Sequence, residues 1–182
     1  MRQIYMETRV RTHTICAMVL VVITMVAALA AGGGFAEARG RYDWPLAPRP
    51  AVVRGFDPPA QRWLAGHRGV DLAAPADAAV IAAGAGSVRF AGVVAGRGVV
   101  SVAHPDGIAT TYEPVRAIVA AGDVVGRGQV LGYLDRGHPG CRATACLHWG
   151  ARRGSGSAVT YLNPLALVGA LRVRLKPVGD PR

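Results

Sequence analysis

Three side chains of the kinds that hold zinc in hydrolases occur in two short segments that are far apart in the chain. His67 and Asp71 belong to GHRGVDLAAP, and His148 belongs to CLHWGAR. Two imidazoles and one carboxylate leave a fourth coordination position open, as in catalytic zinc sites. The glycine between His67 and Asp71 and the AAP that follows favour a loop or extended segment over a helical turn. We therefore expect tertiary structure to bring the three ligands together.

Residues 1–38 have the order of features of a signal peptide. Three arginines precede an uncharged apolar run from Ile15 to Ala31, and the A-x-A-like Ala36-Glu37-Ala38 follows. We expect export and cleavage after Ala38. The alternative is an uncleaved membrane anchor, because the run reaches the lower limit of about 17–25 residues for a spanning helix.

The remaining chain, 39–182, is long enough for one domain with its own core. The whole sequence has 21 basic and 11 acidic side chains, of which the leader holds three arginines and two glutamates. The remaining chain therefore has 18 basic and 9 acidic side chains. This positive charge predicts attraction to anionic cell-wall polymers, and to membrane head groups if the leader stays attached. No basic motif interleaved with aromatic residues is present, so we expect no nucleic-acid partner.

The exported part divides by composition into three segments. Residues 39–65 are rich in proline and are expected to form an extended lead-in that docks through Trp44 and Trp63. Residues 66–168 form the expected domain, and 169–182 form a basic C-terminal tail.

Short valine-rich runs separated by glycine-containing turns fill the middle of the expected domain. The runs AVIAA, SVRFAGVV, GVVSVAHP, GIATTYEPV and DVVGRGQVLGYL predict β-strands, and no convincing helical period lies between them. The sequence therefore predicts an all-β, antiparallel sandwich. Near its end, Asn163 could cap a short helix that begins at Pro164.

Over roughly residues 54–168, the order of six motifs resembles that of the lysostaphin/LytM-type zinc metallopeptidases. The motifs are HRGVD, AVIAAGAGSVRFAG, GVVSVAHPDGIATTYE, GDVVGRGQVLG, CLHWGARR and YLNPL. The resemblance implies an antiparallel β-sheet fold of the duplicated-hybrid-motif type and action on the cross-link peptides of peptidoglycan. It also implies that His67, Asp71 and His148 are the zinc ligands.

Two positions depart from the pattern of active relatives, and no catalytic residue is assigned for that reason. Pro114 stands where those relatives have a histidine two positions after the tyrosine, and Cys146 replaces the first histidine of their H-x-H pair. A positioned acid or base is worth about 10²–10⁴ in rate. The resemblance therefore implies a divergent member of the family with the features of a pseudoenzyme.

Three nearby groups are candidates to replace the missing histidines. Glu113 adjoins Pro114 but should face away from the site, since neighbours on a strand point to opposite faces. His138 lies in the loop before Cys141 and is a candidate to reach over the metal, but we expect it to be exposed, as loop histidines more often are. His104, in AHPDG, is expected to be structural at a tight turn.

Cys141 and Cys146 are the cysteines that remain after export, and an even number in an oxidising compartment predicts a disulfide. The alternative is a Cys-x4-Cys-x-His cluster in which Cys146 binds zinc beside His148.

Two functions remain open on this reading. One is a secreted, cell-wall-associated zinc endopeptidase of weak or lost activity. The other is a noncatalytic module that binds peptidoglycan or activates another cell-wall hydrolase. A purely structural zinc fits less well, because structural sites are usually four-coordinate and only three ligands are identified.

Overall fold

The computed structural model describes residues 40–61 and 63–171. The expected signal peptide and most of the basic tail lie outside these residues. The chain divides into the units Met1–Arg39 and Gly40–Arg182, and the described residues belong to the second. Within the described part, no helix has the length and apolar character needed to cross a membrane.

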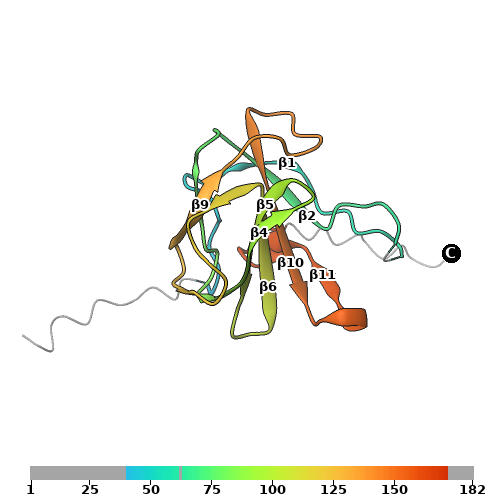
Figure 1. Cartoon of the computed structure of the whole chain (residues 1–182). Helices are drawn as coiled ribbons and strands as arrows, with labels where there is room; N and C mark the ends of the chain where they lie inside the picture. The colour runs from blue at the N-terminus through green and yellow to red at the C-terminus, as the bar shows by residue number, and fades with distance from the viewer. Residues whose placement is uncertain (1–39, 62, 172–182) are drawn as a thin grey trace, which may run out of the picture. The chain divides into compact units, whose positions relative to one another are not determined.

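Two antiparallel sheets make up the described domain, as the valine-rich runs predicted (Figure 1). The larger sheet has the spatial order β1 (Ala51–Arg54), β2 (Gly69–Ala74), β10 (Ala145–Arg153), β6 (Ile108–Glu113), β5 (Arg97–Ala103), β4 (Gly86–Val94) and β8 (Val124–Val125). Strand β11 (Thr160–Leu162) pairs with β10. The smaller sheet is ordered β3 (Ala79–Ile81), β9 (Val130–Leu134) and β7 (Val115–Ala117).

Side chains from both sheets share one hydrophobic core. In the central strands of the larger sheet, Leu72 and Trp149 are fully buried, and Leu131 of β9 meets them from the smaller sheet. Because side chains alternate between the two faces of a strand, the residues between these core positions face away from the core. The functional side chains of β2 and β10 occupy that opposite face.

Strand β10 is the main element that the valine-rich pattern did not predict. It spans CLHWGAR, the segment that carries His148. It lies between β2 and β6, where both faces are covered for much of its length, so its composition lacks a clear alternation of apolar and polar residues.

The expected C-terminal helix is only a short 3₁₀ turn, η2 (Pro164–Ala166). Asn163 caps it as predicted, since its side chain accepts a hydrogen bond from the backbone N–H of Leu165 at 3.1 Å. A second 3₁₀ turn, η1, spans Gly156–Ala158. No helix longer than these two turns occurs within the described residues.

The proline-rich lead-in contributes more to the domain than an extended tail would. It contains β1, and its Tyr42 and Leu46 are buried in the core. Trp44 packs against this core with its ring 6.4 Å from that of Trp149, as expected. The expectation that Trp63 also docks is wrong, because 79% of its surface is exposed.

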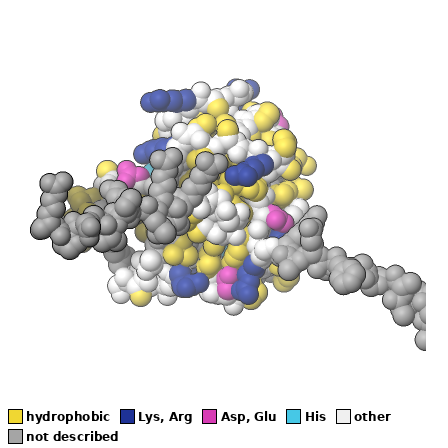
Figure 2. Space-filling model, turned by 180° about the vertical axis from the view of Figure 1, so that it is seen from behind, with side chains coloured by type: hydrophobic (Ala, Val, Ile, Leu, Met, Phe, Trp, Pro, Cys, Tyr) yellow, Lys and Arg dark blue, Asp and Glu magenta, His cyan; other side chains and the backbone are white. Residues whose placement is uncertain are grey.

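Positive side chains are separated from one another on the visible part of one face of the domain. Figure 2 shows Lys and Arg side chains standing singly there, with hydrophobic side chains between them. Such a distribution suits diffuse attraction to an anionic polymer better than a single docking groove for one.

Candidate metal centre

Asp71 and His148 are brought together by the pairing of β2 with β10. The two residues lie directly opposite one another in the antiparallel register, so their side chains share a face of the sheet. Their neighbours along each strand, Val70 and Leu72 in β2 and Trp149 in β10, are fully buried on the core side. The apolar alternation of both strands therefore directs Asp71 and His148 to the opposite face together.

Gly69, two positions before Asp71 in β2, makes room for the imidazole of His148. A Cβ at Gly69 would lie 2.5 Å from the Trp149 carbonyl oxygen and 2.7 Å from Nε2 of His148. Both distances are shorter than any normal contact of a carbon atom. The glycine of HRGVD is thus needed for the close approach of β2 to His148.

His67 enters the cluster from the turn before β2 and is held there by backbone groups. It forms an isolated bridge with Asp57, with N–H···O distances of 2.6 and 2.9 Å. Its Nδ1 lies 2.6 Å from the carbonyl oxygen of Gly55, which can only accept a hydrogen bond. The ring proton is therefore on Nδ1, and Nε2 offers a lone pair, as is usual for a histidine that binds a metal.

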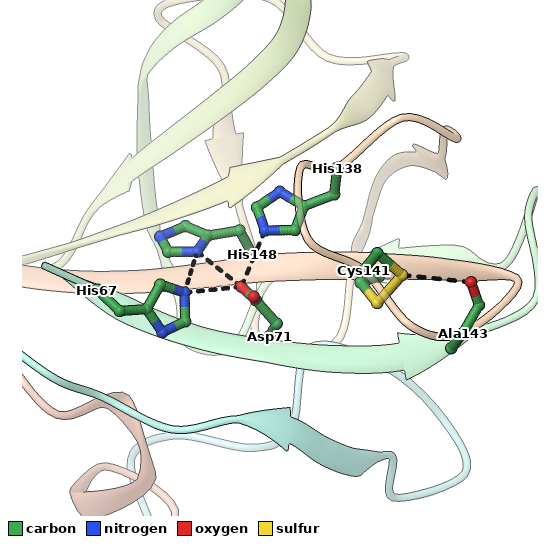
Figure 3. Close-up of a disulfide and its surroundings, with 7 residues drawn as sticks. His67, Asp71, His138, Cys141, Ala143 and His148 are labelled. Atoms are coloured by element: carbon green, nitrogen blue, oxygen red, sulfur yellow. Dashed lines mark hydrogen bonds and ion pairs between the residues drawn. A yellow bond between two sulfur atoms is a disulfide. The ribbon is translucent and has the colours of Figure 1, made fainter.

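The predicted ligand atoms converge, as Figure 3 shows. His67 Nε2, His148 Nδ1 and Asp71 Oδ1 are separated by 2.9, 2.9 and 3.0 Å. Atoms that bind one zinc at about 2.0–2.2 Å in a tetrahedral arrangement are about 3.3 Å apart, so the observed triangle is close to the required size. The donor set, two imidazole nitrogens and one carboxylate oxygen, also fits this metal.

Burial and neighbouring imidazoles act in opposite directions on Asp71. Burial favours the neutral acid, but polar contacts with His138 and His148 and the positive charge available on the histidines outweigh it and hold the pKa of Asp71 below its usual range. The carboxylate is thus ionised. Its Oδ2 has no hydrogen-bond partner among the described residues, although it is buried.

His138 is a fourth member of the cluster. Its Nε2 lies 3.1 Å from Asp71 Oδ1, and its ring stacks on that of His148 with the centroids 5.5 Å apart. One donor atom from each of the four residues lies within 4.8 Å of the others. The expectation that this loop histidine is exposed is wrong, because its side chain is only 10% exposed.

A disulfide joins the His138 loop to β10. Cys141 and Cys146 are bonded, with Cα atoms 5.7 Å apart. Cys146 precedes His148 by two positions, so both side chains lie on the same face of β10. The alternative in which Cys146 binds zinc as a thiolate disagrees with this bond, and no cysteine belongs to the described cluster.

The two positions at which the resemblance implies a missing histidine are occupied by groups without acid–base capacity in this structure. Pro114 is buried just beyond the end of β6, and Cys146 is consumed by the disulfide. Glu113 lies opposite His148 in the β6–β10 register, so the expectation that it faces away is wrong. The buried Tyr112 takes the core face and leaves the other face to Glu113, where its carboxylate forms an ion pair with Arg97.

A groove runs along the sheet beside His148. It is lined by Arg68, Thr111, Glu113, His148, Gly150, Ala151, Arg152 and Tyr161. The guanidinium of Arg68 lies 5.4 Å from the ring centre of Tyr161, a cation–π contact that orders one wall.

His104 has a structural role, as predicted. Its Nδ1 lies 2.9 Å from the carbonyl oxygen of Ala85, and its Nε2 lies 2.8 Å from the hydroxyl of Thr110. Both ring nitrogens are occupied, and the side chain is buried at the β5–β6 turn, away from the metal cluster.

Two of the curated relatives that match are an uncharacterized protein of Mycobacterium tuberculosis and one of Mycobacterium bovis. Each is 53% identical over 140 residues, which cover 77% of this chain and 56% of the relative. The chain therefore spans little more than half the length of these relatives.

Solved structures with the same fold include lysostaphin from Staphylococcus simulans, with a TM-score of 0.60 and 21% identity over 78% of this chain and 59% of that chain. The SpoIIQ–SpoIIIAH pore-forming complex gives a TM-score of 0.59 and 24% identity over 71% of this chain and 91% of that chain. At these identities the likeness establishes the fold.

The profile of peptidase family M23 matches residues 65–161, a range that includes His67, Asp71, His138 and His148. This match covers more than half of the sequence and agrees with the two-sheet fold. The chain belongs to peptidase family M23.

Proposed function

We propose that this M23 domain is exported, holds one zinc ion through His67, Asp71 and His148, and acts on or binds the cross-link peptides of peptidoglycan with little or no remaining turnover. The convergence of His67 Nε2, His148 Nδ1 and Asp71 Oδ1 within 3.0 Å of one another carries the proposal. Three donors this close, two of them imidazoles, need a shared cation or proton, and their types match zinc.

Zinc at this site would supply Lewis acidity for the hydrolysis of a peptide bond. The residues around the metal would hold its histidine ligands in place. The carbonyl of Gly55 fixes the tautomer of His67, and the absence of a side chain at Gly69 admits the ring of His148. Outer contacts of this kind are typically worth about 10- to 100-fold in metal affinity.

The groove beside His148 suits a peptide that carries carboxylates. Arg68 and Arg152 both line it, and its one acidic residue, Glu113, is paired with Arg97. The net positive edge would attract an acidic peptide and orient its chain past the metal cluster. Lysostaphin, which shares the fold, is described as an antimicrobial peptidase, in agreement with a cell-wall substrate.

Weak or absent turnover follows from the groups that stand where acid–base histidines are expected. Proline at 114 and a disulfide-bonded cysteine at 146 can neither accept nor donate a proton. Glu113 is close to His148 but is engaged by Arg97. Loss of two such groups removes most of the rate enhancement, although the losses need not multiply.

Zinc content and digestion of purified sacculi test this proposal together. Protein comprising residues 39–182 should contain about one zinc, and His148→Ala should lose it, whereas Tyr161→Phe, a change in the groove outside the ligand set, should keep it. Wild-type protein should sediment with sacculi and release few or no peptides. Equal zinc in the wild type and His148→Ala would refute the site, and rapid digestion by the wild type would refute the loss of turnover.

The noncatalytic alternative gains support from the same two positions. The fold does not decide between the two functions, because it is shared by an antimicrobial peptidase and by a component of the SpoIIQ–SpoIIIAH complex. If zinc-loaded wild type releases no peptides yet binds sacculi, the protein is a binding module or an activator of another hydrolase.

A further inference from the structure

His138 is a nearly buried histidine that the proposed function does not use. Its side chain is 10% exposed, whereas the flanking Gly137, Pro139 and Gly140 are all exposed. Among the described residues its Nε2 faces only Asp71 Oδ1, at 3.1 Å, and neither ring nitrogen forms a hydrogen bond of good geometry. A largely buried imidazole normally satisfies at least one nitrogen, so the ring is placed as if a further partner lay between it and Asp71.

The position of the ring indicates that this partner would be a cation shared with Asp71 and the other two histidines. His138 Nε2 lies 3.1 Å from Asp71 Oδ1, and the donor atoms of His67, Asp71, His138 and His148 all fall within 4.8 Å of one another. Figure 3 shows the ring of His138 pointing at Asp71 from a loop on the other side of the cluster from His67.

The distance from Asp71 favours a ligand over a base. Two ligands of one tetrahedral zinc lie about 3.3 Å apart. A base that acted on a zinc-bound molecule would stand one hydrogen bond, about 2.6–3.2 Å, further out from the metal. The 3.1 Å separation between His138 Nε2 and Asp71 Oδ1 is that of neighbouring ligands, and the 4.8 Å limit for all four donor atoms means that the loop would close by about 1.5 Å to complete a tetrahedral set.

The disulfide explains how a loop histidine is held at this place. Cys146 and His148 point to the same face of β10, so a bond from Cys146 to Cys141 draws the loop over the cluster. A backbone hydrogen bond of 3.2 Å from Cys141 N–H to the His138 carbonyl tightens the same turn. Cys146, which stands where the resemblance implies a histidine, thus brings His138 to the cluster from the loop.

We propose that His138 is a fourth zinc ligand, placed by the Cys141–Cys146 bond, so that four protein donors enclose the metal and leave no open position. This inference rests on the proposed zinc site and deepens it. A zinc ion with four protein ligands has the coordination of a structural site, and this accounts for low turnover independently of Pro114. Hydrolysis would require that His138 leave the metal.

Cobalt substitution provides a readout that does not depend on activity. The Co²⁺-loaded wild type, residues 39–182, should show the visible absorption of a four-coordinate site and should be insensitive to added azide. In His138→Ala an open position should appear, azide should shift the spectrum, and zinc affinity should fall by at least about 10- to 100-fold. Arg136→Ala, an exposed change two positions away, should behave as the wild type.

The disulfide can be tested in the same assay. Cys141→Ser combined with Cys146→Ser should lower zinc affinity by up to about 30-fold, since closing so short a loop is worth about 2 kcal/mol of chain entropy and about 1.4 kcal/mol is tenfold. In the His138→Ala background the two serine substitutions should have almost no further effect, because the bond acts through His138.

Each result supports or overturns the assignment. If wild type binds neither zinc nor cobalt, both the proposed function and this inference fail. If wild type binds metal and responds to azide, or if His138→Ala retains the wild-type spectrum and affinity while folded by circular dichroism, only the role of His138 is refuted. Additive effects of the serine and alanine substitutions would refute the role of the disulfide.

Discussion

Gly69 offers a direct test of how closely β2 and β10 must approach to form the metal site. The change Gly69→Ala adds one methyl group, whose carbon would lie 2.5 Å from the Trp149 carbonyl oxygen and 2.7 and 2.8 Å from Nε2 and Cε1 of His148. The carbonyl belongs to a central strand paired on both sides, so it cannot swing away like a side chain.

The magnitude follows from these contacts. Relief to the shortest normal separation requires the strands to part, or the His148 ring to move, by at least about 0.5 Å. Overpacking of this kind costs about 1–3 kcal/mol of stability. Displacement of His148 from the triangle should also lower zinc affinity by about 10- to 100-fold or more.

Gly150→Ala is the matched control, because Gly150 lies directly opposite Gly69 in the register. A Cβ there would meet Arg68, Thr111 and His148 only at 3.7, 3.8 and 3.9 Å, which are ordinary contacts. Urea unfolding and zinc competition titration should separate the two variants clearly. If Gly69→Ala unfolds at the same urea concentration as Gly150→Ala and binds zinc equally well, the close approach is not required and our account of the site is wrong.

Three further predictions concern the missing histidines, the disulfide and a buried tyrosine. The triple variant Pro114→His, Cys146→His and Cys141→Ser places histidines at both positions and releases the loop. Cleavage of cross-bridge peptides should rise by about 10²-fold or more in a folded, zinc-loaded sample, and no rise would show that the groove differs beyond these positions. Peptide mapping without reductant should give one cross-linked Cys141–Cys146 species, and two alkylated thiols in native protein would contradict it. Burial raises the pKa of Tyr112 to about 12, so the stability that its neutral form contributes is fully present below about pH 10 and is lost as the pH rises toward 12. Urea midpoints between pH 9 and 12 should therefore decline less in Tyr112→Phe than in wild type, and an equal decline would remove Tyr112 as the cause.

The sequence predicted most of the sheet but missed the strand that matters most for the site. Valine-rich runs between glycines gave β4, β5 and β6 close to their observed bounds, because a half-buried strand imposes its period on the sequence. The single run DVVGRGQVLGYL divides instead into β8 and β9, which belong to different sheets. Strand β10 is central and carries small and aromatic residues, so its pattern is weaker. The short run after Pro164 forms only a 3₁₀ turn, and it ends where Gly169 takes a positive φ of 64° and the Ala170 N–H bonds back to the Leu165 carbonyl.

The convergence of His67, Asp71 and His148 was predictable from residue types and motif order, whereas the place of His138 beside them was not. Its place depends on where a disulfide draws a loop, and that depends on which face of β10 carries Cys146. A signal was nevertheless present: Cys146 and His148 are two positions apart, so in a strand they share a face, and the predicted bond to Cys141 then brings residue 138 near the metal. The orientation of Glu113 was mispredicted for the related reason that the buried face of β6 was not known in advance.

The hydrogen bond from His67 to the carbonyl of Gly55 ties the site to a segment that precedes the family match. The family match starts at residue 65, yet the backbone oxygen that contacts His67 Nδ1 lies ten residues earlier, just after β1. Tyr42 and Leu46, still earlier, are buried in the core. A fragment cut at the family boundary would keep His67, Asp71 and His148 and lose the backbone support of His67 together with part of the core. The folded unit of the described residues therefore includes the chain from Tyr42 onward, and relatives with a different segment before the histidine must support that ring by other means.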